Sequence, residues 1–165
     1  QNGDEISYYE NLDDWYSTSQ GSYIEYNHSE ENGSLFGFLY TPYAIDDVRS
    51  LCTVGWHIPS DTEWMELELI RGMDTLELNT NGWRGESDNI GVMMKSESTW
   101  LEGGNGLNAH GMDMKGGGKI SGSGTGGIFT LINSHCWWWS SSKNEWGNYL
   151  FRSLRADRTG ITEGK

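Results

Sequence analysis

The sequence predicts an α+β fold in which antiparallel strands and one or two helices are joined by long glycine-rich irregular loops. Three observations support this prediction. The 165-residue chain contains 23 glycines and nine tryptophans, a helix start signal stands near its middle, and large and polar residues alternate in its last third. Disordered chains are poor in aromatic residues, so an aromatic fraction of 13% favours an ordered structure. The length suits a single domain over residues 1–165.

The first forty residues are rich in tyrosine and favour short strands. Residues 23–26 alternate in a way that predicts a half-buried strand. Residues 35–40 are apolar at both odd and even positions, which predicts a strand buried on both faces. This strand is expected to end at Pro42.

The clearest helix signal begins at Ser60. Ser60 can cap a helix, and Glu63, three residues later, completes a capping box. Trp64 and Leu67 follow at helical spacing and Gly72 is a natural stop, which predicts a helix of about three turns.

A weaker helix pattern follows residues 87–89, where Met93 and Met94 are interpreted as core filler. Residues 102–127 then contain eleven glycines in 26 positions. Such a segment cannot form a regular helix, because each interior glycine costs about 1 kcal/mol relative to alanine. A phosphate-binding loop is also disfavoured, since no hydroxyl residue follows Lys119.

Residues 128–165 are expected to form β-structure. Alternation places Trp137 and Trp139 on one face of a strand and Trp138 on the other. In the next strand the same rule gives one face to the odd-numbered residues from 151 to 157.

The charge excludes some partners. Eleven basic and 24 acidic residues give a net charge of −13, which disfavours nucleic acid and anionic membranes. No apolar run approaches the roughly 18 residues of a membrane helix, and no signal peptide opens the chain. Because it opens on Gln1, we expect a processed or trimmed segment.

The two cysteines, Cys52 and Cys136, are 84 residues apart, a spacing that fits neither a zinc knuckle nor a redox pair. A disulfide between them would stabilise the fold by about 4 kcal/mol. We favour the interpretation as two buried thiols, and we keep the disulfide as the alternative.

The chain contains acidic residues and histidines, but they do not form a recognisable catalytic motif. The acidic pairs Asp13-Asp14, Glu30-Glu31 and Asp46-Asp47 are interpreted as solvated charges rather than glycosidase carboxylates. The four histidines are scattered, and His57 is expected to be a hydrogen-bonded core residue. No catalytic residue and no cofactor is predicted, although a structural calcium ion stays open because oxygen ligands are abundant.

Three stretches, in order, carry a family resemblance. The first joins residues 39–44 to residues 51–64, which read Leu-Cys-Thr-Val-Gly-Trp-His-Ile-Pro-Ser-Asp-Thr-Glu-Trp. The second covers residues 94–117, and the third joins residues 138–142 to residues 152–154. Together they resemble the Fibrobacter succinogenes major paralogous domain, found in secreted and surface proteins of bacteria.

The resemblance implies a C-type-lectin-like fold with two antiparallel sheets, two helices and long loops held by buried tryptophans. It also implies a binding surface on the late strands, with Trp138 and Trp139 in the core. Thr53 replaces a proline of the family pattern. The closing Gly-Phe-Ser-Val-Arg-Cys strand of the family is absent, so we expect the domain to lack its final strand.

These observations predict a non-catalytic binding or display module, extracellular or at the cell surface, that recognises a glycan or protein ligand. The alternative is a structural subunit of a surface appendage, fibre or viral tail that assembles with neighbouring subunits, and a polysaccharide-active enzyme is a remote third. The candidate ligand-binding residues are Trp137, Lys143, Asn144, Trp146, Phe151, Ser153, Arg155 and Asp157.

Overall fold

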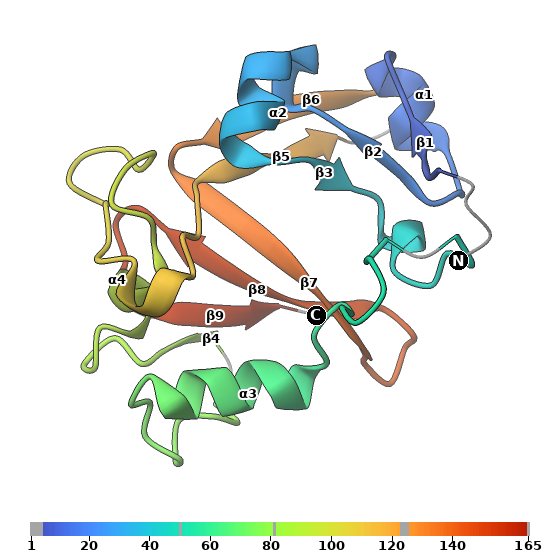
Figure 1. Ribbon diagram of the computed structural model, residues 1–165. Coiled ribbons are helices and arrows are strands. Elements are labelled where there is room, and N and C mark those ends of the chain that lie inside the picture. Colours follow the sequence, from blue (N-terminus) through green and yellow to red (C-terminus); the bar gives the residue numbers. More distant parts are fainter. Residues whose placement is uncertain (1–4, 50, 81, 123–125, 165) are drawn as a thin grey trace. The chain divides into compact units, whose positions relative to one another are not determined.

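The computed structural model describes residues 5–49, 51–80, 82–122 and 126–164 (Figure 1). The chain divides into two compact units. The N-terminal unit consists of Gln1–Ile58 and Lys119–Thr130, and the C-terminal unit of Pro59–Gly118 and Leu131–Lys165. The expectation of one domain over the whole chain stays a prediction.

The N-terminal unit is built on a three-stranded sheet in the order β1 (Ser7–Tyr8), β2 (Ser22–Ile24), β3 (Leu39–Tyr40). Strand β1 is parallel to β2, and β3 is antiparallel to it. Ser22 and Ile24 are wholly buried on one face of β2. The unit also contains helices α1 (Leu12–Ser17) and α2 (Glu30–Phe36) and the short 3₁₀ turns Tyr26–His28 and Pro42–Ala44.

The two helices of this unit differ from the prediction of strands alone. Helix α1 is capped by Asn11 Oδ1, which accepts from the N–H groups of Asp13 and Asp14, and α2 is capped by Ser29. The predicted strand over residues 35–40 is wrong in its first half, because residues 35–36 close α2. Gly37 then turns the chain with a φ of 80°, and the strand starts only at β3.

The C-terminal unit contains a four-stranded antiparallel sheet in the order β4-β9-β8-β7. Its strands are β4 (Gly82–Arg84), β7 (His135–Lys143), β8 (Tyr149–Arg155) and β9 (Ile161–Gly164). Figure 1 shows helix α3 (Asp61–Ile70) lying along this sheet. Strands β5 (Gly117–Gly122) and β6 (Gly127–Ile132) form a separate two-stranded ribbon, and the boundary between the units falls within both. The predicted α+β class with antiparallel sheets is confirmed.

Helix α3 begins where the sequence predicts. Ser60 Oγ accepts from the N–H of Glu63 at 3.3 Å, and Ser60 N–H donates to Glu63 Oε2 at 2.8 Å, which completes the capping box. The second predicted helix is also present as α4 (Ile90–Met94), and Met94 is wholly buried. The interpretation of these methionines as core filler is confirmed.

The core of the C-terminal unit lies on one face of the sheet. Register places Cys136 beside Leu154 there, and Trp138 packs against the same cluster. Trp137 and Trp139 lie on the opposite face, as alternation predicts. The placement of Trp139 in the core is therefore wrong. The buried members of the cluster are Trp64, Met73, Leu78, Ile90, Met94, Trp100, Met114, Cys136, Leu154 and Ile161.

The glycine-rich segment and the two cysteines differ in part from what the sequence predicts. Residues 117–122 of the glycine-rich segment form β5 rather than an irregular loop, whereas residues 123–125 lie outside the described part of the chain. Cys136 is buried and Cys52 is half-buried, and the two are not joined by a disulfide in the described part of the chain. Burial raises the pKa of the Cys136 thiol well above its ordinary value. Within the described residues, the helices are too short or too polar to traverse a bilayer.

Candidate ligand-binding site

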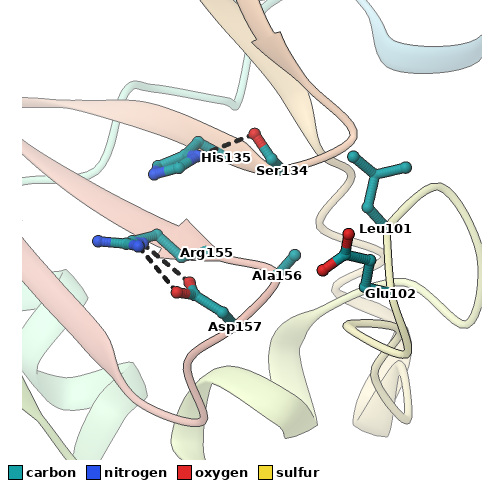
Figure 2. A pocket seen from close by; sticks show the side chains of 7 residues that line it. All are labelled: Leu101, Glu102, Ser134, His135, Arg155, Ala156 and Asp157. Atoms are coloured by element: carbon teal, nitrogen blue, oxygen red, sulfur yellow. Dashed lines mark hydrogen bonds and ion pairs between the residues drawn. The ribbon is translucent and has the colours of Figure 1, made fainter.

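A pocket of about 310 Å³ opens in the C-terminal unit, where β7 begins and β8 ends (Figure 2). One wall comes from the start of β7, the second from the end of β8 and the residues after it, and the third from a separate loop. The lining residues are Leu101, Glu102, Ser134, His135, Arg155, Ala156 and Asp157. The pocket therefore contains two of the eight residues that the sequence singles out, Arg155 and Asp157.

Arg155 and Asp157 form a bidentate ion pair at the pocket. Arg155 Nε donates to Asp157 Oδ1 at 2.9 Å and Arg155 Nη2 to Asp157 Oδ2 at 2.8 Å. The hydrogen bonds from Arg155 lower the pKa of the Asp157 carboxyl, which keeps it ionised at neutral pH. Arg155 Cζ also lies 5.9 Å from the centroid of the Trp83 ring, so an aromatic surface helps to orient the guanidinium.

His135, the first residue of β7, adds an imidazole ring, and Ser134 just before it adds a hydroxyl. His135 is stacked on Trp137, with 5.4 Å between ring centroids and 8° between ring planes. Ser134 Oγ lies 3.0 Å from His135 Nδ1. The two rings are therefore nearly parallel, and the Ser134 hydroxyl lies beside the imidazole.

Leu101 and Glu102 face the pocket from a tight turn, as Figure 2 shows. The N–H of Gly104 donates to the carbonyl of Leu101 at 2.8 Å, and the two central residues have φ angles of 53° for Glu102 and 78° for Gly103. Two positive φ angles are typical of a type I′ turn, which usually has Asn or Asp in its first central position. Glutamate occupies that position here, and its longer carboxylate lines the pocket.

Buried side chains hold the wall after β8 in place. The Lys95 side chain is almost fully buried, and its Nζ donates to the carbonyl of Arg158 at 2.6 Å. Desolvation lowers the pKa of the Lys95 ammonium. The N–H of Ala156 donates to the carbonyl of Ser134 at 2.8 Å, which joins the two strand ends that line the pocket.

The remaining predicted residues do not converge on the pocket. Trp137, Phe151 and Ser153 continue along the same face of β7 and β8, but Ser153 is only 4% exposed because Trp137 and Thr162 flank it in register. It therefore offers almost no surface to a ligand. The other three predicted residues, Lys143, Asn144 and Trp146, lie at the opposite end of the β7–β8 hairpin, about 20 Å away along the length of β8.

The hairpin tip is an ordered turn. Asn144 Oδ1 accepts hydrogen bonds from the N–H groups of Trp146 and Asn148 at 3.0 Å each. The N–H of Asn144 donates to the carbonyl of Asn148 at 2.9 Å. Trp146 projects from this turn and is 72% exposed, as its position outside the family pattern predicts.

Most residues of the acidic pairs have structural roles. Asp13-Asp14 and Glu30-Glu31 occupy the first turns of α1 and α2, where the helix dipole favours negative charge. Asp47 binds the Arg49 guanidinium, whose hydrogen bonds lower the pKa of Asp47 to about 2. Among the described residues, no three His, Cys, Asp or Glu side chains gather in a group that could hold a metal ion. Structural calcium stays a prediction.

His57 differs from its expected place in the core. Its side chain is exposed, as is that of Trp56 next to it. The N–H of Trp56 donates to the carbonyl of Thr53 at 3.0 Å, and this turn carries the two rings outward. The side chain of His110 lies outside the described part of the chain.

Sequence reasoning missed five residues of the pocket. His135 precedes Trp137 by two positions, so the alternation that placed the tryptophan could also have placed the histidine. No local signal identifies Leu101, Glu102 or Ala156, because the pocket depends on contacts between distant segments. Ser134 is recognisable only as a turn residue.

The fold and pocket define a mixed α+β protein with a depression at the end of an antiparallel sheet. The chain belongs to the Fibrobacter succinogenes major domain family, whose model matches residues 1–158. Comparisons with curated proteins and with solved structures gave no match.

Proposed function

We propose that this chain is a non-catalytic module, extracellular or at the cell surface, that binds a glycan at the pocket between the ends of β7 and β8. The observation that carries the proposal is the Arg155–Asp157 ion pair beside the stacked rings of His135 and Trp137. Sugars have apolar C–H faces that pack on aromatic rings and hydroxyl groups that hydrogen-bond to paired donors and acceptors. The pocket supplies the ion pair and the His135 ring, and Trp137, which stacks on His135, extends the aromatic surface beside it.

Binding fits the electrostatics of the pocket better than glycoside hydrolysis does. A glycosidase needs one carboxyl group with a raised pKa to act as general acid. The pKa of Asp157 is shifted the other way, and both of its oxygens already accept hydrogen bonds from Arg155. An ion pair held in this way is suited to orienting ligand hydroxyls rather than to transferring a proton.

A glycan array followed by titration calorimetry tests the proposal. We expect Arg155→Ala to weaken binding of the best array ligand by at least about tenfold, because a bidentate pair is lost. Lys115→Ala is the matched control, since Lys115 is another cation of the C-terminal unit that does not line the pocket. Its affinity should equal that of the unchanged protein.

Three outcomes would overturn the proposal. The first is an array without any bound glycan, and the second is equal loss of affinity in both variants. The third is release of new reducing ends from the ligand, which would favour the enzyme alternative. Light scattering on the same sample separates the remaining alternative, because a structural subunit would form polymers without added sugar.

A further inference from the structure

The face of β7 and β8 that leads away from the pocket is arranged in rungs. Cross-strand partners there are His135 with Arg155, Trp137 with Ser153, Trp139 with Phe151 and, after a register shift, Lys143 with Tyr149. Residues two apart in a strand are about 6.6 Å apart. We call this face the aromatic strip and define it by these eight residues.

The rings of the strip hold one another in position. Besides the His135–Trp137 stack, Trp139 and Phe151 pack edge to face with 6.2 Å between ring centroids. Lys143 Nζ lies 4.3 Å from the centroid of the Tyr149 ring. Trp137, Trp139, Phe151 and Tyr149 are all half-buried. A ring that is already ordered loses little entropy when a ligand packs on it.

The strip is distinct from the hydrophobic core of the unit. The residues that alternate with it, such as Cys136 and Leu154, point into the core on the other face of the sheet. Strip aromatics therefore do not complete that core. In β8 the same alternation separates Phe151 from the wholly buried Arg152.

The charges on the strip favour a neutral ligand. Its cations stand at the two ends, where Lys143 lies over Tyr149 and Arg155 is paired with Asp157. The middle rungs hold uncharged side chains only. The net charge of −13 opposes the approach of an anionic polymer.

From these observations we propose that the ligand is a linear, neutral polysaccharide bound lengthwise, with one sugar unit in the pocket and the next units packed along the aromatic strip. This inference rests on the proposed function and specifies its ligand class. The rungs of the aromatic strip span six residue steps in β8, from Arg155 to Tyr149, or about 20 Å. A single sugar or a disaccharide covers only a part of that length.

A length series tests the inference. Calorimetry would compare xylose and β-1,4-linked xylo-oligosaccharides of two to eight units, and the corresponding glucose series, with the unchanged protein. We expect affinity to rise by at least about tenfold from the disaccharide to the hexasaccharide and then to level off. Equal affinity at every length would overturn the inference and leave the proposed function standing. Failure to bind any glycan on the array would instead overturn the proposed function.

Substitutions of single tryptophans test which part of the aromatic strip contacts the polysaccharide. Trp139→Ala should weaken hexasaccharide binding by at least about tenfold and leave disaccharide binding nearly unchanged, because Trp139 lies one rung beyond Trp137. Trp56→Ala is the matched control, since Trp56 is 77% exposed, belongs to the N-terminal unit and should have no effect. Trp146→Ala should affect only ligands long enough to reach the hairpin tip.

A measurement without substitutions covers the case in which Trp139→Ala does not fold. The indole N–H signals of Trp137 and Trp139 can be followed by NMR while oligosaccharides are added. We expect the hexasaccharide to shift both signals and the disaccharide to shift that of Trp139 little or not at all. Unmoved signals at saturation with the hexasaccharide would overturn the lengthwise arrangement.

Discussion

Arg152 Nε donates a hydrogen bond to Glu68 Oε1 at 2.6 Å, and both side chains are wholly buried. The second oxygen of Glu68 accepts from Arg84 Nη2 at 2.9 Å. Arg152 also reaches Asp61 Oδ1 at 2.7 Å, and Arg84 reaches Glu163 Oε2 at 3.2 Å. This network joins α3 to β4, β8 and β9, so it fixes the sheet whose other face carries the aromatic strip.

Replacing Glu68 with alanine should destabilise the protein strongly. The change leaves two buried guanidinium groups without their shared carboxylate, which costs about 3–5 kcal/mol in free energy of unfolding. Urea unfolding followed by tryptophan fluorescence measures it. Glu66→Ala, at an exposed position of the same helix, should change that free energy by less than about 0.5 kcal/mol. Equal effects of the two changes would contradict the importance of the network.

Gly91→Ala should also destabilise the C-terminal unit. A Cβ at position 91 would overlap the carbonyl oxygen of Gly160, and a backbone atom cannot move aside easily. Overpacking of this kind costs about 1–3 kcal/mol, which thermal unfolding would detect. Gly103→Asn is the matched control, because position 103 has open space and a φ of 78° that asparagine tolerates. A control variant with the lower melting temperature would refute this explanation.

Local signals decide how much of the fold the sequence reveals. The capping box at Ser60 and Glu63 is complete within four residues, so α3 is predictable. Helices α1 and α2 have side-chain caps as well, but they contain six and seven residues without a buried stripe. Tyrosine alternation around them gave a competing strand signal, and tertiary context decided the outcome.

The candidate site was likewise predictable only where a local pattern decides which way a side chain points. Period two correctly assigns Phe151 and Arg155 to the face opposite Arg152, because alternation is a local property of a strand. It cannot show that Ser153 is covered by neighbours from two other strands. Nor can it bring Glu102 to the pocket, since that contact depends on how distant segments pack.

In the N-terminal unit, the hydroxyl group of Tyr8 should titrate with a raised pKa. Tyr8 Oη donates to Glu25 Oε2 at 2.6 Å, and this hydrogen bond raises the pKa of Tyr8 to about 12. Because the folded pKa is above the ordinary value of 10.0, the stabilisation from this bond is present below pH 10 and disappears as pH rises through 12. Phenolate absorbance, taken as the difference between the protein and Tyr8→Phe, should show this titration. In Glu25→Gln the pKa should fall, and an unchanged value would contradict the assigned cause.

The Arg155–Asp157 pair predicts how ligand binding depends on pH. Hydrogen bonds from Arg155 place the pKa of Asp157 below its ordinary value of 3.8, so the pair is intact at higher pH and breaks as pH falls through that lowered pKa. The contribution of the ion pair to glycan affinity should therefore be constant from neutral pH down to about pH 5 and be lost only in stronger acid. Carbon-13 NMR of the Asp157 carboxyl measures the titration directly. In Arg155→Ala its midpoint should move up toward 3.8, whereas a wild-type midpoint at or above that value would show that the ion pair does not form in solution.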